Sequence, residues 1–143
     1  MGVTCRLAAP GVVTRQLNLH GGAGRLDAAT PQSDSPVGSF RYDPAAPTPS
    51  LGGPLLSRTA GVRDNATLEA RPDVLTFTTQ TLVGPVEVIG PVTAKLRVGA
   101  KAGSHFDVYA RLCDVDETGR SAASVTASSG CPRSPAAIRS TSR

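Results

Sequence analysis

The sequence Phe-Asp-Val-Tyr-Ala-Arg-Leu, residues 106–112, decides the fold class, because apolar side chains occupy every second position along it. The same alternation runs through Val-Thr-Ala-Lys-Leu-Arg-Val, residues 92–98. Successive side chains of a β-strand point to opposite faces, so this pattern is typical of strands with one face on a core and the other in water. Such strands are typical of antiparallel sheets. No strong helical period competes anywhere, and the sequence predicts an all-β fold.

Weaker strand signals lie on both sides of these two segments. They cover residues 12–19, 39–42, 74–79 and 86–88. The glycine-rich segment 21–24 lacks the Lys and Ser/Thr of a phosphate-binding loop, so we interpret it as a turn. With 15 glycines and 12 prolines, turns are frequent. Short strands between frequent turns are typical of a β-sandwich.

Length and charge narrow the function classes. A chain of 143 residues forms one domain at most. The net charge of +4 comes mainly from the C-terminal end, because the first 120 residues carry 12 basic and 11 acidic side chains. A nucleic-acid-binding surface needs a basic stripe with interleaved aromatics, and this pattern is missing from the sequence. We therefore expect no nucleic-acid partner.

The composition changes after Arg120. Residues 121–143 are rich in Ser, Ala and Thr, contain no acidic or aromatic residue, and hold only Val125 and Ile138 as large aliphatic residues. Such a segment buries too little apolar surface to offset the entropy lost on ordering. The sequence thus predicts a partial β-sandwich over residues 1–120 and a disordered low-complexity tail over residues 121–143.

Cysteines and hydropathy bear on location. Cys5, Cys113 and Cys131 are odd in number and lack metal-ligand spacing, which favours free thiols in a reducing compartment. No secretory leader pattern opens the sequence, and no apolar run approaches the roughly 20 residues that span a bilayer. We expect a cytoplasmic chain with no membrane partner.

Residues with catalytic or ligand chemistry are few. The sequence has no Gly-x-Ser-x-Gly nucleophile motif, and neither His20 nor His105 has a patterned partner, so His20 is interpreted as a solvated strand-end residue. The acidic residues Asp114, Asp116 and Glu117 lack calcium-loop spacing and fit a turn better. We expect no catalytic residue, no metal and no cofactor. The sequon at Asn65 is too common a pattern to indicate glycosylation.

Arg71 and Asp73 flank Pro72 and carry opposite charges. Proline fixes its own backbone angle and restricts the residue before it, so the two charged side chains stand on a stiff turn. We predict an Arg–carboxylate pair that fixes this turn against the sheet or against a partner domain.

The order and spacing of several motifs resemble the C-terminal β-domain of the X-Pro dipeptidyl-peptidase and cocaine-esterase-like (CocE/NonD) hydrolases. The first is a Leu-x-Leu strand with a glycine-rich turn, the second a Tyr-Asp-Pro block that ends in Gly-Gly, and the third a Glu-x-Arg-x-Asp-Val-Leu block. A Gly-Pro-Val strand start and a strand that ends in Gly-Arg-Ser follow. In this sequence they lie at residues 17–26, 42–53, 69–75, 90–92 and 106–121.

The resemblance implies a jelly-roll β-sandwich of the galactose-binding-like kind that is not itself catalytic. In that family the domain accompanies an α/β-hydrolase domain, absent from this sequence, which carries the Ser-Asp-His triad. The implied parent activity is that of a serine hydrolase on X-Pro peptides or acyl esters, and the implied partner is that catalytic domain. A homo-oligomer is a further possibility that the family suggests.

The motifs stop at Ser121, which suggests a truncated member of the family, and a natural short variant is the alternative. Two further readings stay open. One is a free-standing carbohydrate-binding module, for which Phe40, Tyr42 and Tyr109 are the aromatic residues outside the expected core. The other is a truncated product that does not fold, because missing strands would expose sheet edges.

Overall fold

The computed structural model describes residues 2–5, 13–33, 35–53, 60–101, 105–132 and 137–139, and for residues 2–5, 124–132 and 137–139 it describes the backbone alone. These residues hold seven strands and one helix of four residues, so the all-β fold class is confirmed. The chain divides into two compact units. Unit 1 comprises Met1–Val37, Phe77–Ala110 and Ala127–Arg143, and unit 2 comprises Gly38–Thr76 and Arg111–Thr126.

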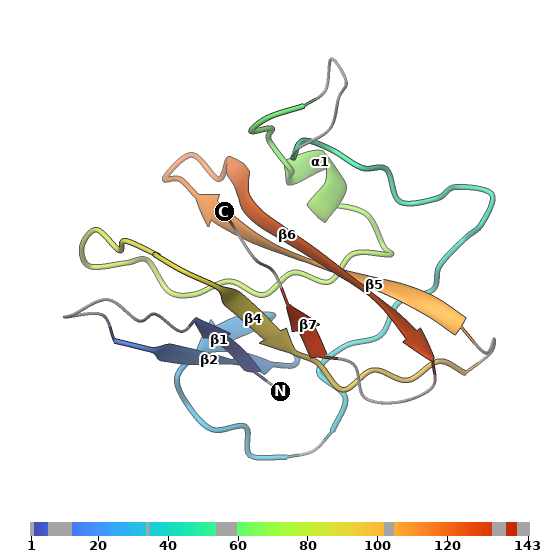
Figure 1. Cartoon of the computed structure of the whole chain (residues 1–143), viewed down its shortest axis with the longest axis horizontal. Helices are drawn as coiled ribbons and strands as arrows, with labels where there is room; N and C mark the ends of the chain where they lie inside the picture. Colours follow the sequence, from blue (N-terminus) through green and yellow to red (C-terminus); the bar gives the residue numbers. More distant parts are fainter. Residues whose placement is uncertain are drawn as a thin grey trace. The chain divides into compact units, whose positions relative to one another are not determined.

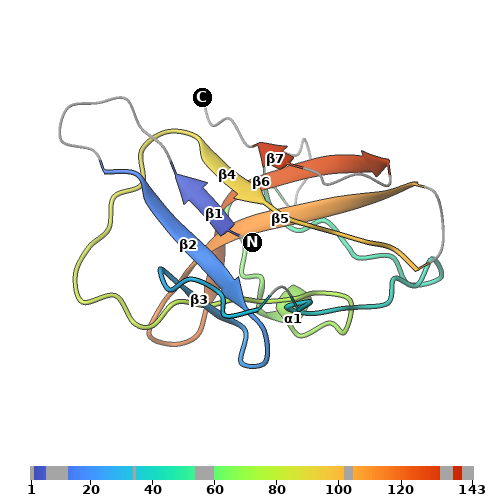
Figure 2. The same ribbon diagram turned by 90° about the horizontal axis from the view of Figure 1, so that it is seen from below.

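Unit 1 is organised around an antiparallel sheet with the strand order β3-β2-β1-β4-β7 (Figures 1 and 2). The strands are β1 (Gly2–Cys5), β2 (Arg15–His20), β3 (Arg25–Asp27), β4 (Val92–Lys95) and β7 (Ala137–Arg139).

The register of this sheet places the central strand β1 between two neighbours. Val3 is paired with Leu17 of β2 on one side and with Ala94 of β4 on the other. β2 and β3 are joined by the expected glycine-rich turn, in which Gly22 and Gly24 have φ angles of 82° and 61°. Only glycine adopts such angles at little cost, which accounts for the turn.

The second sheet pairs β5 (His105–Val115) with β6 (Ser121–Pro132). The alternation that the sequence shows in β5 is present, since Phe106 and Val108 are half-buried while Asp107 and Tyr109 are exposed. At Arg111 and Cys113 the face opposite Phe106 and Val108 is half-buried as well. This change at Arg111 marks the start of the part of β5 that belongs to unit 2.

The expected disorder from residue 121 does not describe the part of that segment seen in the structure. Strand β6 covers Ser121–Pro132 and strand β7 covers Ala137–Arg139, which pairs with β4. Small residues such as Ser, Ala and Thr supply backbone donors and acceptors as well as any others, so pairing with a strong neighbour such as β5 can order them. Residues 133–136 and 140–143 lie outside the described residues.

Several predicted strands are not formed. Residues 39–42 and 86–88 are extended or irregular chain, and the segment 74–79 takes part in the first sheet only through a bridge between Arg25 and Thr78. Alternation shows which residues suit a strand, but pairing also requires a neighbouring strand. The turn expected near Leu68 is part of helix α1 (Ala66–Glu69). Among the described residues no helix is long and apolar enough to cross a membrane.

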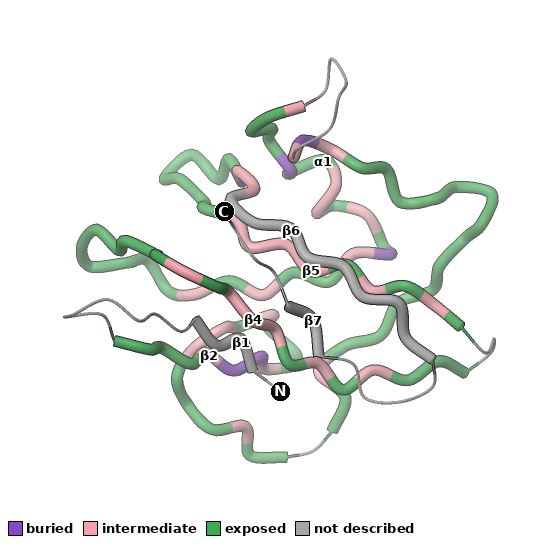
Figure 3. The backbone as a smooth tube through the Cα atoms, in the orientation of Figure 1, coloured by how far each residue is buried: buried purple, intermediate pink, exposed green. Residues whose placement is uncertain are grey.

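Few of the residues whose burial the structure describes are buried, as the purple segments of Figure 3 show. Among the residues whose burial the structure describes, Leu19 is the one buried large hydrophobic residue, with 7% of its surface exposed. The other buried side chains there are polar: Asn18, Asn65, Asp73 and Ser121. Hydrophobic burial is the main force that stabilises a domain, so polar contacts carry an unusual share of the order in the described parts.

Candidate functional site

The predicted pair between Arg71 and Asp73 forms. Arg71 Nε donates to Asp73 Oδ1 over 2.7 Å, and Arg71 Nη2 donates to Asp73 Oδ2 over 2.8 Å. This two-pronged geometry is the strong form of an Arg–carboxylate contact. The Asp73 side chain is buried, whereas Arg71 is partly accessible. The pair therefore locks the turn around Pro72, just after α1.

The pair also holds a second segment of unit 2, which we call the proline loop (residues 43–50). Arg71 Nη2 donates to the carbonyl oxygen of Ala46 over 2.7 Å, and Thr48 Oγ1 donates to Asp73 Oδ2 over 2.6 Å. The proline loop is exposed along its whole length. The predicted pair thus fixes a surface loop, and no contact with a sheet is involved in these bonds.

We call the pair of Arg71 and Asp73, with its bonds to Ala46 and Thr48, the clamp. The same bonds set the pKa values of its two charged groups. The hydrogen bonds from Arg71 and then from Thr48 hold the pKa of Asp73 well below its ordinary value, because they stabilise the ionised carboxylate. The hydrogen bond to Asp73 likewise raises the pKa of Arg71. Both groups are charged at neutral pH, and a charge-neutral, hydrogen-bonded pair of this kind is suited to holding structure.

A second polar cluster of unit 2 centres on Asn65, which is 1% exposed. Its backbone N–H donates to Ser121 O over 2.7 Å, and its Nδ2 donates to Ser121 O over 3.2 Å and to Arg63 O over 3.1 Å. Its Oδ1 accepts from Arg111 Nη1 over 2.5 Å, and the same nitrogen donates to Leu51 O over 2.8 Å. Asn65 therefore joins α1, β5, β6 and the segment before residue 54. A side chain so engaged is no glycosylation acceptor.

The cluster continues through Ser121, Glu69 and Cys113. Ser121 is 1% exposed, and its Oγ donates to Glu69 Oε1. Asn65 Nδ2 lies 3.9 Å from Cys113 Sγ. Burial raises the pKa of the Cys113 thiol, and a protonated thiol is a poor nucleophile. The free Cys113 is therefore part of the packing, and the cluster fixes α1 to the second sheet.

The acidic residues between β5 and β6 form the predicted turn. Asp116 Oδ1 accepts from Thr118 N over 2.9 Å, from Thr118 Oγ1 over 2.6 Å and from Arg120 N over 3.0 Å. These donors, led by Thr118 Oγ1, lower the pKa of Asp116. Asp114 and Glu117 are exposed. The described residues bring no group of three His, Cys, Asp or Glu together in a way that could hold a metal.

His20 ends β2, as expected, but it is not solvated. Its side chain is 15% exposed, and Nε2 lies 2.8 Å from Asp27 Oδ1. Asp27 Oδ2 is in turn 2.7 Å from Arg25 Nε, and the Ala29 N–H lowers the pKa of Asp27. Nε2 of His20 has no aligned hydrogen bond within the described part of the chain, so its contact with Asp27 is electrostatic. The three side chains join β2 to β3, whereas His105 is exposed at the start of β5.

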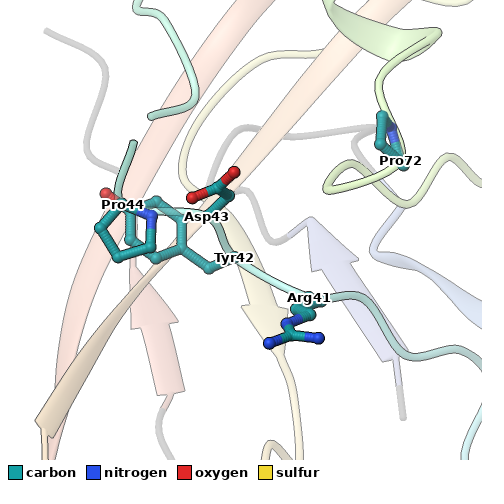
Figure 4. A pocket seen from close by; sticks show the side chains of 5 residues that line it. All are labelled: Arg41, Tyr42, Asp43, Pro44 and Pro72. Carbon is teal, nitrogen blue, oxygen red and sulfur yellow. The ribbon is translucent and has the colours of Figure 1, made fainter. Parts of the chain in front are cut away.

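A shallow pocket of about 480 Å³ lies on unit 2 (Figure 4). Four of its lining residues come from one consecutive stretch and the fifth from the turn after α1: Arg41, Tyr42, Asp43, Pro44 and Pro72. Tyr42 is 55% exposed, and the clamp of Arg71 and Asp73 fixes both edges of the pocket. The lining offers an exposed aromatic ring, a guanidinium and a carboxylate, which are suited to binding a polar molecule.

Most of these contacts could not be found from sequence. Arg71 and Asp73 are two positions apart, so their pair left a local signal. Asn65 and Arg111 are 46 positions apart, and the single hint was an arginine in the middle of an apolar strand. The clusters among the described residues hold segments of unit 2 together.

Comparison with known proteins gives two matches. The family model described as the X-Pro dipeptidyl-peptidase C-terminal non-catalytic domain matches residues 7–138. The chain is 40% identical over 108 residues to the cocaine esterase of Rhodococcus sp. (strain MB1 Bresler); this covers 74% of the chain and 18% of the esterase. No solved structure matches the chain. The family match runs past Ser121, where the quoted motifs stop, so the resemblance is longer than the sequence motifs indicate.

Proposed function

Because the chain belongs to the family of X-Pro dipeptidyl-peptidase C-terminal non-catalytic domains, we propose that it serves as the accessory β-domain of a serine hydrolase. The observation that carries the proposal is the family match over residues 7–138. The polar clusters of unit 2 support it, because they are built to hold loops and not to react. In this role the chain supplies no catalytic group, and the activity resides in an α/β-hydrolase domain.

The substrate class follows from the relatives. The family is named for X-Pro dipeptidyl peptidase, and the matched relative is a cocaine esterase. The proposed parent enzyme is a serine hydrolase that acts on acyl esters or on peptides with proline in the second position. The chain spans 18% of the length of the esterase, which leaves most of that enzyme for the catalytic parts.

The proposal includes a cytoplasmic location. It rests on the odd number of cysteines and on Cys113, which is a free thiol in the structure. Free thiols persist where the medium is reducing. Fractionation of the producing cells with an antibody to the chain tests this part.

A hybrid enzyme tests the proposed function. The matched segment of the Rhodococcus cocaine esterase is replaced by this chain, and hydrolysis of cocaine is measured for the hybrid, for the esterase without the segment, and for the chain alone. We expect the hybrid to hydrolyse cocaine, the shortened esterase to lose at least about tenfold in activity or to unfold, and the chain alone to show no activity.

Two outcomes contradict the proposal. Hydrolysis by the purified chain alone would show that it carries its own catalytic groups. A hybrid that is no more active and no more stable than the shortened esterase would show that the chain does not support the hydrolase. Circular dichroism of the chain alone accompanies the assay, and a cooperative β-type melt shows that the material tested is folded.

A second candidate function is carbohydrate binding, and the pocket around Tyr42 is the observation that favours it. Sugar-binding sites commonly stack a ring on an aromatic side chain and bind hydroxyl groups with charged side chains, and the pocket is lined by Tyr42 and by the charged residues Arg41 and Asp43. A glycan array with the chain and with Tyr42→Ala tests it. Binding that is lost in the variant supports the candidate, and the absence of any bound glycan contradicts it.

A further inference from the structure

The segment that precedes β4 exposes an unusual number of large aliphatic side chains. We call residues 82–89 the apolar loop; within its eight positions five such side chains are exposed, and Val83 is fully accessible. In Figure 1 the loop belongs to the yellow-green chain that leads into β4. The exposed residues are Leu82, Val83, Val86, Val88 and Ile89.

Single exposed aliphatic residues are ordinary, but a group of them is not. Each exposed large aliphatic side chain forgoes part of the free energy that full burial would contribute. The loop is also stiffened, because Pro85 follows Gly84 within it and Pro91 follows Gly90, whose φ angle is 102°, just beyond it. A stiff apolar surface loses little entropy when it is covered, which favours binding.

The residue types of the apolar loop narrow the class of molecule that can bind to it. From residue 80 to residue 94 the sequence has one charged side chain, Glu87, and no Lys, Arg or aromatic residue. Phosphate groups are bound by cations, and peripheral membrane contacts rely on Lys, Arg and aromatic side chains, so neither nucleic acid nor a lipid surface fits. Sugars need polar or aromatic contacts. An apolar protein surface is the occupant that fits.

Two observations identify that protein surface. The matched relative devotes 18% of its length to the matched stretch, so in that enzyme the stretch is joined to a much longer remainder in the same chain. In addition, the described residues of unit 1 bury one large hydrophobic side chain, Leu19, while five large aliphatic side chains of the apolar loop are exposed. A tethered domain is always at high effective concentration, which makes it the natural cover.

We propose that the apolar loop is the surface through which this chain packs onto an apolar face of the catalytic domain of its hydrolase. The proposal rests on the function proposed above and deepens it, because it names the residues that contact the partner.

The test uses the hybrid with the Rhodococcus esterase and two matched variants. Val83→Asp puts a charge into the apolar loop, whereas Val13→Asp puts the same charge at another exposed valine of unit 1. A buried, unpaired carboxylate is costly, and an exposed one is not. We expect Val83→Asp to lower the melting temperature of the hybrid by at least about 3 °C and Val13→Asp to change it by less than about 1 °C.

Equal melting temperatures for the two variants in an active hybrid would overturn the apolar loop as the contact and leave the accessory role intact. An inactive wild-type hybrid would overturn the accessory role itself, so the two failures are distinguishable. Val83→Asp in the chain alone is measured by circular dichroism; a large loss of structure there would show that the loop packs within the chain, which overturns the proposal.

Binding of a second copy of the chain or of lipid to the apolar loop would give different experimental results. If the chain alone is a dimer by light scattering and Val83→Asp makes it a monomer, the loop binds a second copy. If the chain sediments with vesicles of neutral phosphatidylcholine and Val83→Asp abolishes this, the loop binds lipid. Either result overturns the proposal, whereas a monomeric chain that ignores vesicles is the result we expect.

Discussion

The two units of this chain differ in which side chains are paired and which are left exposed. In unit 2, Asn65 and Asp73 are buried and each is bonded to several partners within the unit. In unit 1, the buried hydrophobic interior among described residues is Leu19, while the apolar loop leaves five large aliphatic side chains in water. Unit 2 exposes large hydrophobic side chains as well, among them Tyr42 and Val62, but among the described residues the apolar loop gathers five within eight positions.

The difference bears on the proposed docking of the apolar loop to a partner domain. A buried polar network is stable only if its members are hydrogen-bonded, and here the members bond to one another within unit 2. Exposed aliphatic side chains gain from any apolar cover, and the described part of unit 1 provides none. A domain that accompanies a catalytic domain is expected to show this division: one self-contained part and one part that is completed on docking.

The largest expected effect is that of Asn65→Ala, which changes the central residue of the polar cluster in unit 2. The change removes the bonds of the Asn65 side chain with Ser121 O, Arg63 O and Arg111 Nη1, while Arg111 Nη1 keeps Leu51 O and Ser121 O keeps the backbone N–H of residue 65. The loss of these hydrogen bonds, one of them to a charged group, suggests a loss of about 2–4 kcal/mol in the free energy of unfolding. Urea unfolding of the chain measures it, and Thr67→Ala on the exposed side of α1 is the control. A loss below about 0.5 kcal/mol would contradict the role given to Asn65.

A second expected effect concerns the glycines that end the proline-rich segment. Gly52 has a φ angle of 67°, and a Cβ atom there would lie 2.6 Å from Gly61 O, so Gly52→Ala is both strained and obstructed. Gly53 has a φ angle of 83°, and a Cβ atom there would meet nothing within 4 Å. We expect a loss of about 2–3 kcal/mol for Gly52→Ala and about 1 kcal/mol for Gly53→Ala, from urea unfolding. Equal losses would show that the close approach to Gly61 is not formed.

The clamp gives a pH-dependent prediction. The pKa of Asp73 is lower in the folded chain than in the unfolded chain, so its contribution is present above about pH 4 and is lost as the pH falls further. We expect Asp73→Asn to lower the melting temperature by about 5 °C at pH 7, and the difference from wild type to shrink toward pH 2. Asp114→Asn, at an exposed position, is the control. A difference that stays constant down to pH 2 would mean that the clamp does not act through the ionised carboxylate.

The smallest expected effect lies in the apolar loop of the isolated chain. Val83→Ser removes a fully exposed side chain, so the free energy of unfolding should change by less than about 0.5 kcal/mol. Solubility should rise and the binding of a hydrophobic dye should fall, because the apolar patch becomes smaller. A clear loss of stability would show that Val83 is packed, and the contrast between the two units would then disappear.

The sequence predicted the features whose causes are local. Residues 106–112 showed their alternation because each position of a strand reports its own face, and the pair of Arg71 and Asp73 was visible because the two stand beside one proline. The cluster of Asn65 left little local signal, since its distant partners come from β5 and β6, 46 or more positions away. The strand expected at residues 86–88 did not form, because alternation says nothing about whether a neighbouring strand is present.

Strand β6 shows the opposite error. Its composition of Ser, Ala and Thr predicted disorder, yet its first residue, Ser121, is buried and bonded to Asn65 and Glu69. Backbone pairing does not depend on apolar side chains, so composition underestimated it. The family match to residue 138 agrees with a folded segment there.

Hydrogen exchange, followed by mass spectrometry, tests the central claim most directly. It compares the chain alone with the hybrid made from the Rhodococcus esterase. The account predicts that the Asn65 amide, bonded to Ser121 O, is protected in both, whereas the amides of the apolar loop exchange rapidly in the chain alone and at least about tenfold more slowly in the hybrid. Apolar-loop amides that exchange at the same rate in both proteins would contradict it.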